Sequence, residues 1–141
     1  MATEFHAFSF KNVNVIWGII QIEGYAEGDD AVTIEYETDQ FNDSAGAKGD
    51  VVRTQTNDNR CAVTIKLFQN STSNKLLTAA YNVDANTGVG VQPMVIEDKE
   101  SGEAFTINNA WIRKYPIITR GQGVNTMEWV FRGDKMVPLI T

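Results

Sequence analysis

The sequence has little of the chemistry from which catalytic and metal sites are built. Its 141 residues include one histidine, His6, and one cysteine, Cys61. A single cysteine excludes an intrachain disulfide, and no His/Cys cluster has the spacing of a zinc site. A Ser-His-Asp triad would have to be built on His6, and nothing else in the sequence supports one. We therefore predict that the chain is not an enzyme and binds no cofactor or metal ion.

Long apolar runs and an excess of positive charge are also missing. No apolar stretch approaches the roughly 18 residues of a membrane span, and the N-terminal MATEFHAFSF lacks the regions of a signal peptide. We expect a protein made in a cytoplasm, with no membrane partner. The 12 basic and 18 acidic side chains give a formal net charge of −6. This balance argues against a general nucleic-acid binder, because such proteins need clustered cations to neutralise phosphates.

Alternation of apolar and polar residues, the pattern of a half-buried β-strand, dominates what is present. In residues 32–36, Val, Ile and Tyr alternate with Thr and Glu, and residues 63–67 repeat the pattern. Turns rich in Gly and Asp separate such stretches. About eight to ten strands are expected, which indicates a mainly β fold: a β-sandwich or small barrel of two packed antiparallel sheets. The length suits a single domain spanning residues 1–141.

Residues 73–82 depart from this rhythm. Leu76, Leu77, Ala80 and Tyr81 recur at helical spacing and define one apolar face. The preceding Ser and Thr residues offer an oxygen for the N-cap, and Asn82 is a plausible end. We predict one substantial helix here, flanking the sheets, followed by a loop at 84–88.

A long interrupted stretch, residues 39–59, separates two of the strand patterns. Most connections in compact domains are short, and long ones are usually functional or disordered. This one carries charges of both signs and larger apolar side chains, but no catalytic constellation. We interpret it as an extended loop or hairpin that serves as an arm for assembly with other copies. The candidate contact residues are Phe41, Asp43, Lys48, Asp50, Val51, Val52, Arg53, Asp58 and Arg60.

The order of several sequence blocks resembles the tail tube proteins of contractile-tailed bacteriophages, especially a compact group of this length. The first blocks are a strand pattern ending in Trp17-Gly18 and the segment IEGYAEGDD at 22–30. The strongest runs over 46–77, GAKGDVVRTQTNDNRCAVTIKLFQNSTSNKLL, and a C-terminal Trp-Val-Phe at 129–131 precedes Gly133-Asp134. The resemblance covers most of the chain, and its specificity comes from the order of the blocks.

That resemblance implies a structural role in a virion. Family members form hexameric rings that stack into a hollow tube, and each subunit is a β-sandwich with a flanking helix. Their inner sheets join into one barrel around the lumen, and an extended loop reaches the next ring. DNA passes through the lumen without specific binding when the sheath contracts. Sheath, baseplate hub and tail terminator are the implied partners, and type VI secretion and contractile bacteriocin tubes have related folds.

Polar strand positions are candidates for the lumen wall. Acidic and polar side chains there would repel the DNA duplex, which suits the net acidity of the chain. The alternation alone does not say which strand face is inside. The candidates are Glu23, Glu35 and Thr64.

Two alternatives remain open from the sequence. One is a tube-initiating or tube-terminating tail protein of the same fold, which would stop polymerisation. The other is a monomeric β-barrel that binds a small ligand, with Trp17, Trp111 and Trp129 lining a pocket. Core packing is the competing interpretation of these tryptophans, since all three lie in strand patterns.

Overall fold

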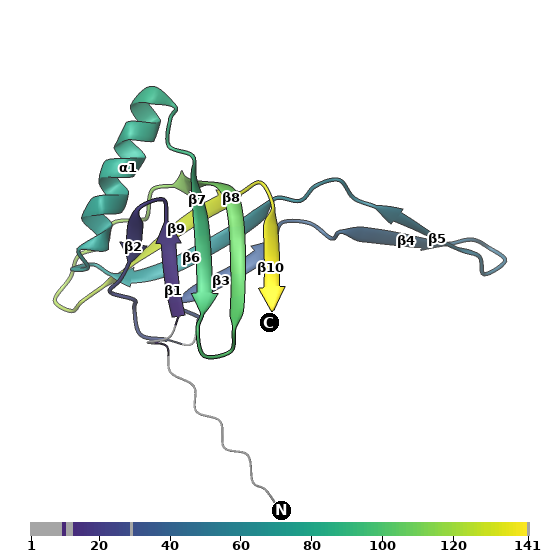
Figure 1. The fold of residues 1–141 in the computed structure, drawn as a ribbon, viewed down its shortest axis with the longest axis horizontal. Helices are drawn as coiled ribbons and strands as arrows, with labels where there is room; N and C mark the ends of the chain where they lie inside the picture. Colours follow the sequence, from purple (N-terminus) through teal and green to yellow (C-terminus); the bar gives the residue numbers. More distant parts are fainter. Residues whose placement is uncertain (1–9, 11–12, 29, 141) are drawn as a thin grey trace, which may run out of the picture.

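The structure, a computed structural model, describes residues 10, 13–28 and 30–140 (Figure 1). His6 and the strand expected around Phe8 lie outside these residues. The described part of the chain contains ten strands and one helix. In chain order these are β1 (Val13–Trp17), β2 (Ile20–Ile22), β3 (Val32–Tyr36), β4 (Phe41–Ala45), β5 (Val51–Gln55), β6 (Cys61–Phe68), α1 (Ser73–Thr87), β7 (Gln92–Asp98), β8 (Glu103–Lys114), β9 (Thr126–Gly133) and β10 (Met136–Ile140).

Eight of the strands form one antiparallel sheet that folds over on itself at β8. The strand order is β2-β1-β7-β8-β9-β6-β3, and β10 also pairs with β8. The first part of β8 pairs with β10 through residues 103–107, whereas its last part pairs with β9 through residues 110–114. The long strand β8 therefore belongs to two layers, with β3, β6 and β9 crossing behind β1, β7 and β10 (Figure 1).

The two layers make a sandwich rather than a closed barrel. Among the described residues, the backbone ladder of β3 runs only to β6. The nearest link from β3 to β10 is a side-chain bond, in which the Tyr36 hydroxyl donates to the Met136 carbonyl oxygen over 2.9 Å. Of the two architectures predicted, the sandwich is confirmed and the closed barrel is wrong.

The core lies between the layers and contains two of the three tryptophans. Trp17 and Trp129 are 1% and 0% exposed. The Trp17 ring packs edge-on against Phe131 with centroids 5.1 Å apart, and its indole N–H donates to the Ala110 carbonyl oxygen over 3.1 Å. The Trp129 indole N–H donates to the Asn74 side-chain oxygen over 2.9 Å. Side chains buried in this way cannot line an open pocket, so core packing is confirmed for both.

Helix α1 begins at the predicted residue but ends later. It continues past Asn82 to Thr87, and Gly88 then takes the left-handed conformation that ends many helices, with φ 71°. The Gly88 N–H bonds the Asp84 carbonyl oxygen over 2.7 Å, and the Thr87 hydroxyl bonds the Val83 carbonyl oxygen. The predicted end at Asn82 and the predicted loop at 84–88 are wrong, because the last turn is largely polar and leaves no apolar periodicity to detect.

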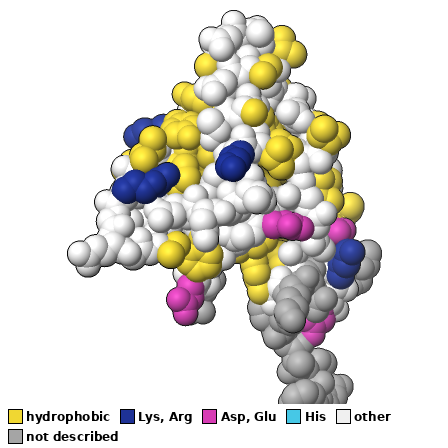
Figure 2. All heavy atoms as spheres, turned by 90° about the vertical axis from the view of Figure 1, so that its left-hand side faces the viewer, with side chains coloured by type: hydrophobic (Ala, Val, Ile, Leu, Met, Phe, Trp, Pro, Cys, Tyr) yellow, Lys and Arg dark blue, Asp and Glu magenta, His cyan; other side chains and the backbone are white. Residues whose placement is uncertain are grey.

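Only the first half of α1 is well packed. Leu77 is fully buried, and Ala80 and Tyr81 pack against the core from its edge. Leu76, predicted on the same face, is 51% exposed. Figure 2, which views the molecule from the end opposite the hairpin of β4 and β5, shows hydrophobic side chains exposed along the helix. The apolar stripe that contacts the sheet is thus narrower than the sequence pattern suggested.

Candidate functional site

Residues 39–59 form a β-hairpin that projects away from the sandwich (Figure 1). Strands β4 and β5 pair from Phe41 opposite Gln55 to Ala45 opposite Val51, and every residue of both strands is exposed. The hairpin is closed by a bond from the Gly46 N–H to the Asp50 carbonyl oxygen over 2.7 Å. We call residues 39–59 the arm.

The base of the arm is tied to the sandwich by backbone bonds and ion pairs. The Glu37 N–H bonds the Arg60 carbonyl oxygen over 3.0 Å, which extends the β3–β6 ladder toward the arm. The Glu37 carboxylate pairs with Arg132 of β9 over 2.9 Å. The Asp58 carboxylate pairs with Arg60 over 2.8 Å, and hydrogen bonds from Arg60 lower the pKa of Asp58 to about 2. These contacts orient the arm relative to the sheet.

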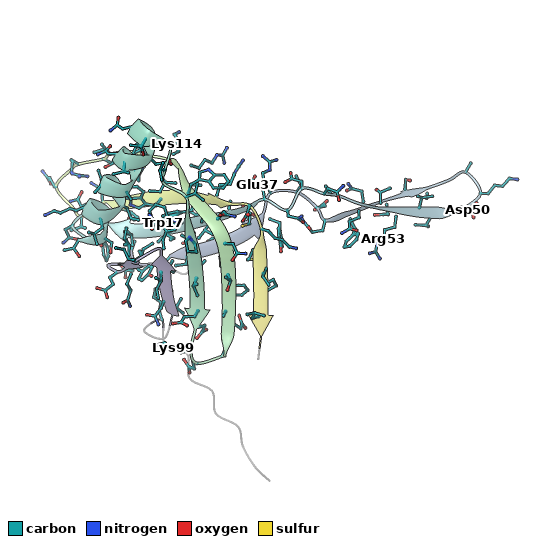
Figure 3. The ribbon with its side chains drawn as sticks, turned by 45° about the horizontal axis from the view of Figure 1, so that its top comes forward. Trp17, Glu37, Asp50, Arg53, Lys99 and Lys114 are labelled. Atoms are coloured by element: carbon teal, nitrogen blue, oxygen red, sulfur yellow. The ribbon has the colours of Figure 1, made fainter. Side chains whose placement is uncertain are left out.

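The register gives the arm two different faces, because residues directly opposite each other point the same way. One face, which we call the charged face, carries Phe41, Asp43, Val51 and Arg53. The Arg53 guanidinium carbon lies 3.9 Å from the centroid of the Phe41 ring, so this cation and aromatic are already in contact. The other face carries Asn42, Ser44, Val52 and Thr54 and is mostly amide and hydroxyl. Figure 3 shows Asp50 and Arg53 on the projecting arm.

The structure brings the proposed contact residues onto one projection. Asp58 and Arg60 lie at its base and bond each other. The remaining candidates lie along the strands and tip of the arm: Phe41, Asp43, Lys48, Asp50, Val51, Val52 and Arg53.

The three lumen candidates do not share one face. Glu35 and Thr64 both point outward from the layer of β3 and β6, since their neighbours Ile34, Val63 and Ile65 point into the core. Glu23 lies just after β2, on the other layer, where its backbone N–H donates to the Ser73 hydroxyl over 2.9 Å.

An exposed apolar group at the opposite end of the molecule was missed from the sequence. Ile117 and Ile118 follow Pro116 in the connection between β8 and β9, and they are 78% and 63% exposed. The sequence did contain a signal for this surface. Two adjacent isoleucines lie outside any alternating stretch, and Arg120 follows them closely.

Other site types find no support in the described residues. Across residues 10, 13–28 and 30–140 there is no group of three or more His, Cys, Asp or Glu placed to hold a metal ion. Within the same ranges no helix has the length and apolarity needed to span a membrane.

Solved structures of contractile injection systems share this fold. A chain of the sheath-tube complex of the extracellular contractile injection system PVC, in its extended state, matches with a TM-score of 0.67 and 12% identity, over 96% of this chain and 93% of that one. The sheath/tube terminator of the same system gives a TM-score of 0.65 and 14% identity, over 98% and 99%. The tube-terminating cap of the anti-feeding prophage gives 0.63 and 10%, over 100% and 95%.

Comparison of the sequence finds one matching family but no matching individual protein. No curated protein shows significant sequence similarity to the chain. The family model of the bacteriophage PhiTE tail tube protein matches residues 6–137, and the chain therefore belongs to this family of phage tail tube proteins.

Proposed function

We propose that this protein is the subunit of a contractile phage tail tube, in which six copies close into a ring and the rings stack into a conduit for DNA. Membership of the tail tube family supports the tube. The observation that supports stacking is the arm, a hairpin whose two strands pair with each other and are exposed at every residue.

The physical properties of the arm support a contact with other copies. A two-stranded hairpin alone is marginally stable in water, and its outer edges carry backbone groups that can pair with another chain. Phe41, Val51 and Val52 are all exposed, so apolar surface is available for burial. Among the predicted contact residues, Asp58 and Arg60 bond each other, which leaves Asp43, Lys48, Asp50 and Arg53 to set the register between rings.

The outward face of β3 and β6 suits the lumen wall better than the surroundings of Glu23. It carries Glu35 and Thr64, and two cations on or beside it are paired within the chain. Lys66 pairs with Asp30 over 2.7 Å, and Arg132 pairs with Glu37 over 2.9 Å. Cations that are already paired would hold the phosphates of a passing duplex less strongly than free ones. We therefore propose Glu35 and Thr64, rather than Glu23, as lumen residues.

The partners follow by analogy with the assemblies in which the similar structures were solved, which contain a sheath, a terminator and a baseplate. We infer that the tube contacts a sheath along its side, with a baseplate hub and a terminator at its ends. The protein would then be a virion component made in the cytoplasm of the bacterial host.

A tube-terminating role is the second candidate, since two of the similar structures are terminators. The two roles differ in whether the assembly can grow. A tube subunit adds rings without limit, whereas a terminator stops after one or a few.

Negative-stain electron microscopy of the purified chain, paired with its mass by light scattering, tests this proposal. Long hollow tubes with six-fold end views are the expected result. Single rings that never stack would favour the terminator. A monomer at every concentration, which also fails to join tubes seeded by a baseplate complex, would contradict both.

A further inference from the structure

The end of the molecule opposite the arm carries a second surface that its own chain leaves uncovered (Figure 2). Two hollows lie there, one of about 510 Å³ beside α1 and one of about 380 Å³ between the end of β8 and the start of β9. Tyr115 lines both hollows. We define the end surface as Lys75, Lys114, Tyr115, Ile117, Ile118 and Arg120.

The floor of the end surface is rigid. The Tyr115 hydroxyl lies 3.0 Å from the Thr78 hydroxyl of α1. Its ring packs against the buried Trp129 and against Tyr81, with centroids 5.3 Å apart in each case. A preformed floor lowers the entropy cost of binding a partner. The exposed Ile117 and Ile118 at its margin offer apolar area to that partner.

The charges of the end surface and of the arm are opposite. Lys75, Lys114 and Arg120 are exposed, and Glu128 is the one carboxylate among the residues that line the two hollows. Residues 39–59 carry four Asp against one Lys and one Arg. Since Asp58 is paired with Arg60, the remaining charges of the arm sum to −1. Complementary charges of this kind steer encounter and set register.

We propose that the end surface of one copy receives the charged face of the arm of a second copy. Phe41 and Val51 would pack on Ile117 and Ile118, and Asp43 would lie near Lys114. The inference rests on the proposed function and deepens it, because it names the surface that the arm contacts. The arm and the end surface lie at opposite ends of the molecule, so each copy offers one of each, and head-to-tail contacts of this type repeat.

A third hollow is a poorer receptor for the arm. It has a volume of about 590 Å³, with an apolar floor that includes Val32, Ile96 and Phe105. Four carboxylates also line it, those of Glu27, Glu97, Asp98 and Glu103. An arm with a net negative charge would be repelled by this rim.

Charge reversal within one strand of the arm tests the proposal with a matched control. Asp43→Lys changes the charged face, whereas Ser44→Lys adds the same cation to the other face of the same exposed strand. We expect Asp43→Lys to raise the concentration needed for assembly by about tenfold and Ser44→Lys to change it by less than about threefold. Combining Asp43→Lys with Lys114→Glu should restore assembly. Failure of this rescue, or equal effects of the two lysines, would overturn the inference.

Cross-linking gives a second test that does not require tubes. Cys61 is fully buried, so introduced cysteines are the reactive thiols. Mixing Asp43→Cys protein with Lys114→Cys protein under mild oxidation should form a disulfide-linked dimer at least about tenfold faster than Ser44→Cys with Lys114→Cys. Equal rates would refute the assigned contact.

Further variants distinguish the stacking role of the arm from the assignment of the end surface as its receptor. If deletion of the arm tip abolishes stacking but Ile117→Asp and Arg120→Glu have no effect, the stacking role stands and the end surface is wrong. If Glu97→Lys blocks stacking instead, the acid-rimmed hollow is the receptor and our assignment is again wrong. If the arm deletion still forms tubes, both the stacking role and the end surface are refuted.

Discussion

Side chains from both layers fill the space around Gly133, where β8, β9 and β6 meet. A Cβ added there would overlap the Ile107 side chain and would lie 2.9 Å from the Cys61 sulfur. Both neighbours are fully buried, so a Cβ at this position would require one of them to shift. The packing between the two layers therefore requires a residue without a side chain at position 133.

We predict that Gly133→Ala lowers the free energy of unfolding by about 1–3 kcal/mol, because overpacking forces neighbouring side chains off their preferred rotamers. Urea unfolding followed by tryptophan fluorescence would measure it. The control is Gly123→Ala, where an added Cβ meets nothing within 4 Å. Equal stability of the two variants would show that the site around Gly133 relaxes freely.

The ion pair at the base of the arm predicts a response to acid. Hydrogen bonds from Arg60 lower the pKa of Asp58 from its ordinary value of 3.8 to about 2. Since the folded-state pKa is depressed, the contribution of the pair is complete above pH 3.8 and disappears as the pH falls through about 2. NMR titration of the Asp58 carboxyl should show this midpoint, and Arg60→Gln should return it toward the ordinary value. A midpoint near 3.8 in the unaltered chain would mean that the pair does not form in solution.

At the scale of elements, the helix packs on the core whereas the arm does not. Helix α1 is held by a few buried groups in its first half, among them Leu77 and the bond between Asn74 and Trp129. The arm contributes nothing to the core, since its strands are exposed on both faces. The helix is therefore part of what stabilises the fold, whereas the arm is free to serve another molecule.

Two adjacent leucines test the packing of α1. We predict that Leu77→Ala costs about 2–5 kcal/mol of stability, because it opens a cavity in the core. Leu76→Ala should change stability by less than about 0.5 kcal/mol, since this side chain is half exposed and alanine also favours helix. Thermal or urea unfolding of the two variants measures these changes. Similar losses of stability for both would contradict the observed orientation of the helix.

At the scale of the whole molecule, the subunit is asymmetric. The arm projects from one end of the sandwich, and the other end carries an apolar surface flanked by cations. A subunit of this shape would suit the proposed head-to-tail contacts, because such contacts close into rings or extend into filaments.

Deleting residues 45–52 should separate folding from stacking. We expect the shortened chain to keep the thermal midpoint of the full chain within about 2 °C, because none of the deleted side chains is buried. It should form rings or smaller species but no long tubes, as seen by electron microscopy and light scattering. Long tubes from the deletion variant would remove the stacking role of the arm.

Local patterns in the sequence were enough to predict most of the strands, the start of the helix and the hairpin of the arm. Alternation marked β3 and β6 because a strand buried on one face shows its period directly. The interval at 39–59 stood out because it is too long for an ordinary connection. The order of its blocks also indicated the tail tube family, which the family match confirms.

Only the tertiary structure determined the features that depend on residues far apart in the sequence. Alternation cannot say which face is inside, so the shared outward face of Glu35 and Thr64 appeared only with the register of β3 and β6. Nor can it say that β8 bends and serves two layers, which makes a sandwich instead of a barrel. Ile117 and Ile118 are exposed beyond Lys114, where β8 ends and the chain leaves the sheet, and no local pattern reports whether another segment will cover them.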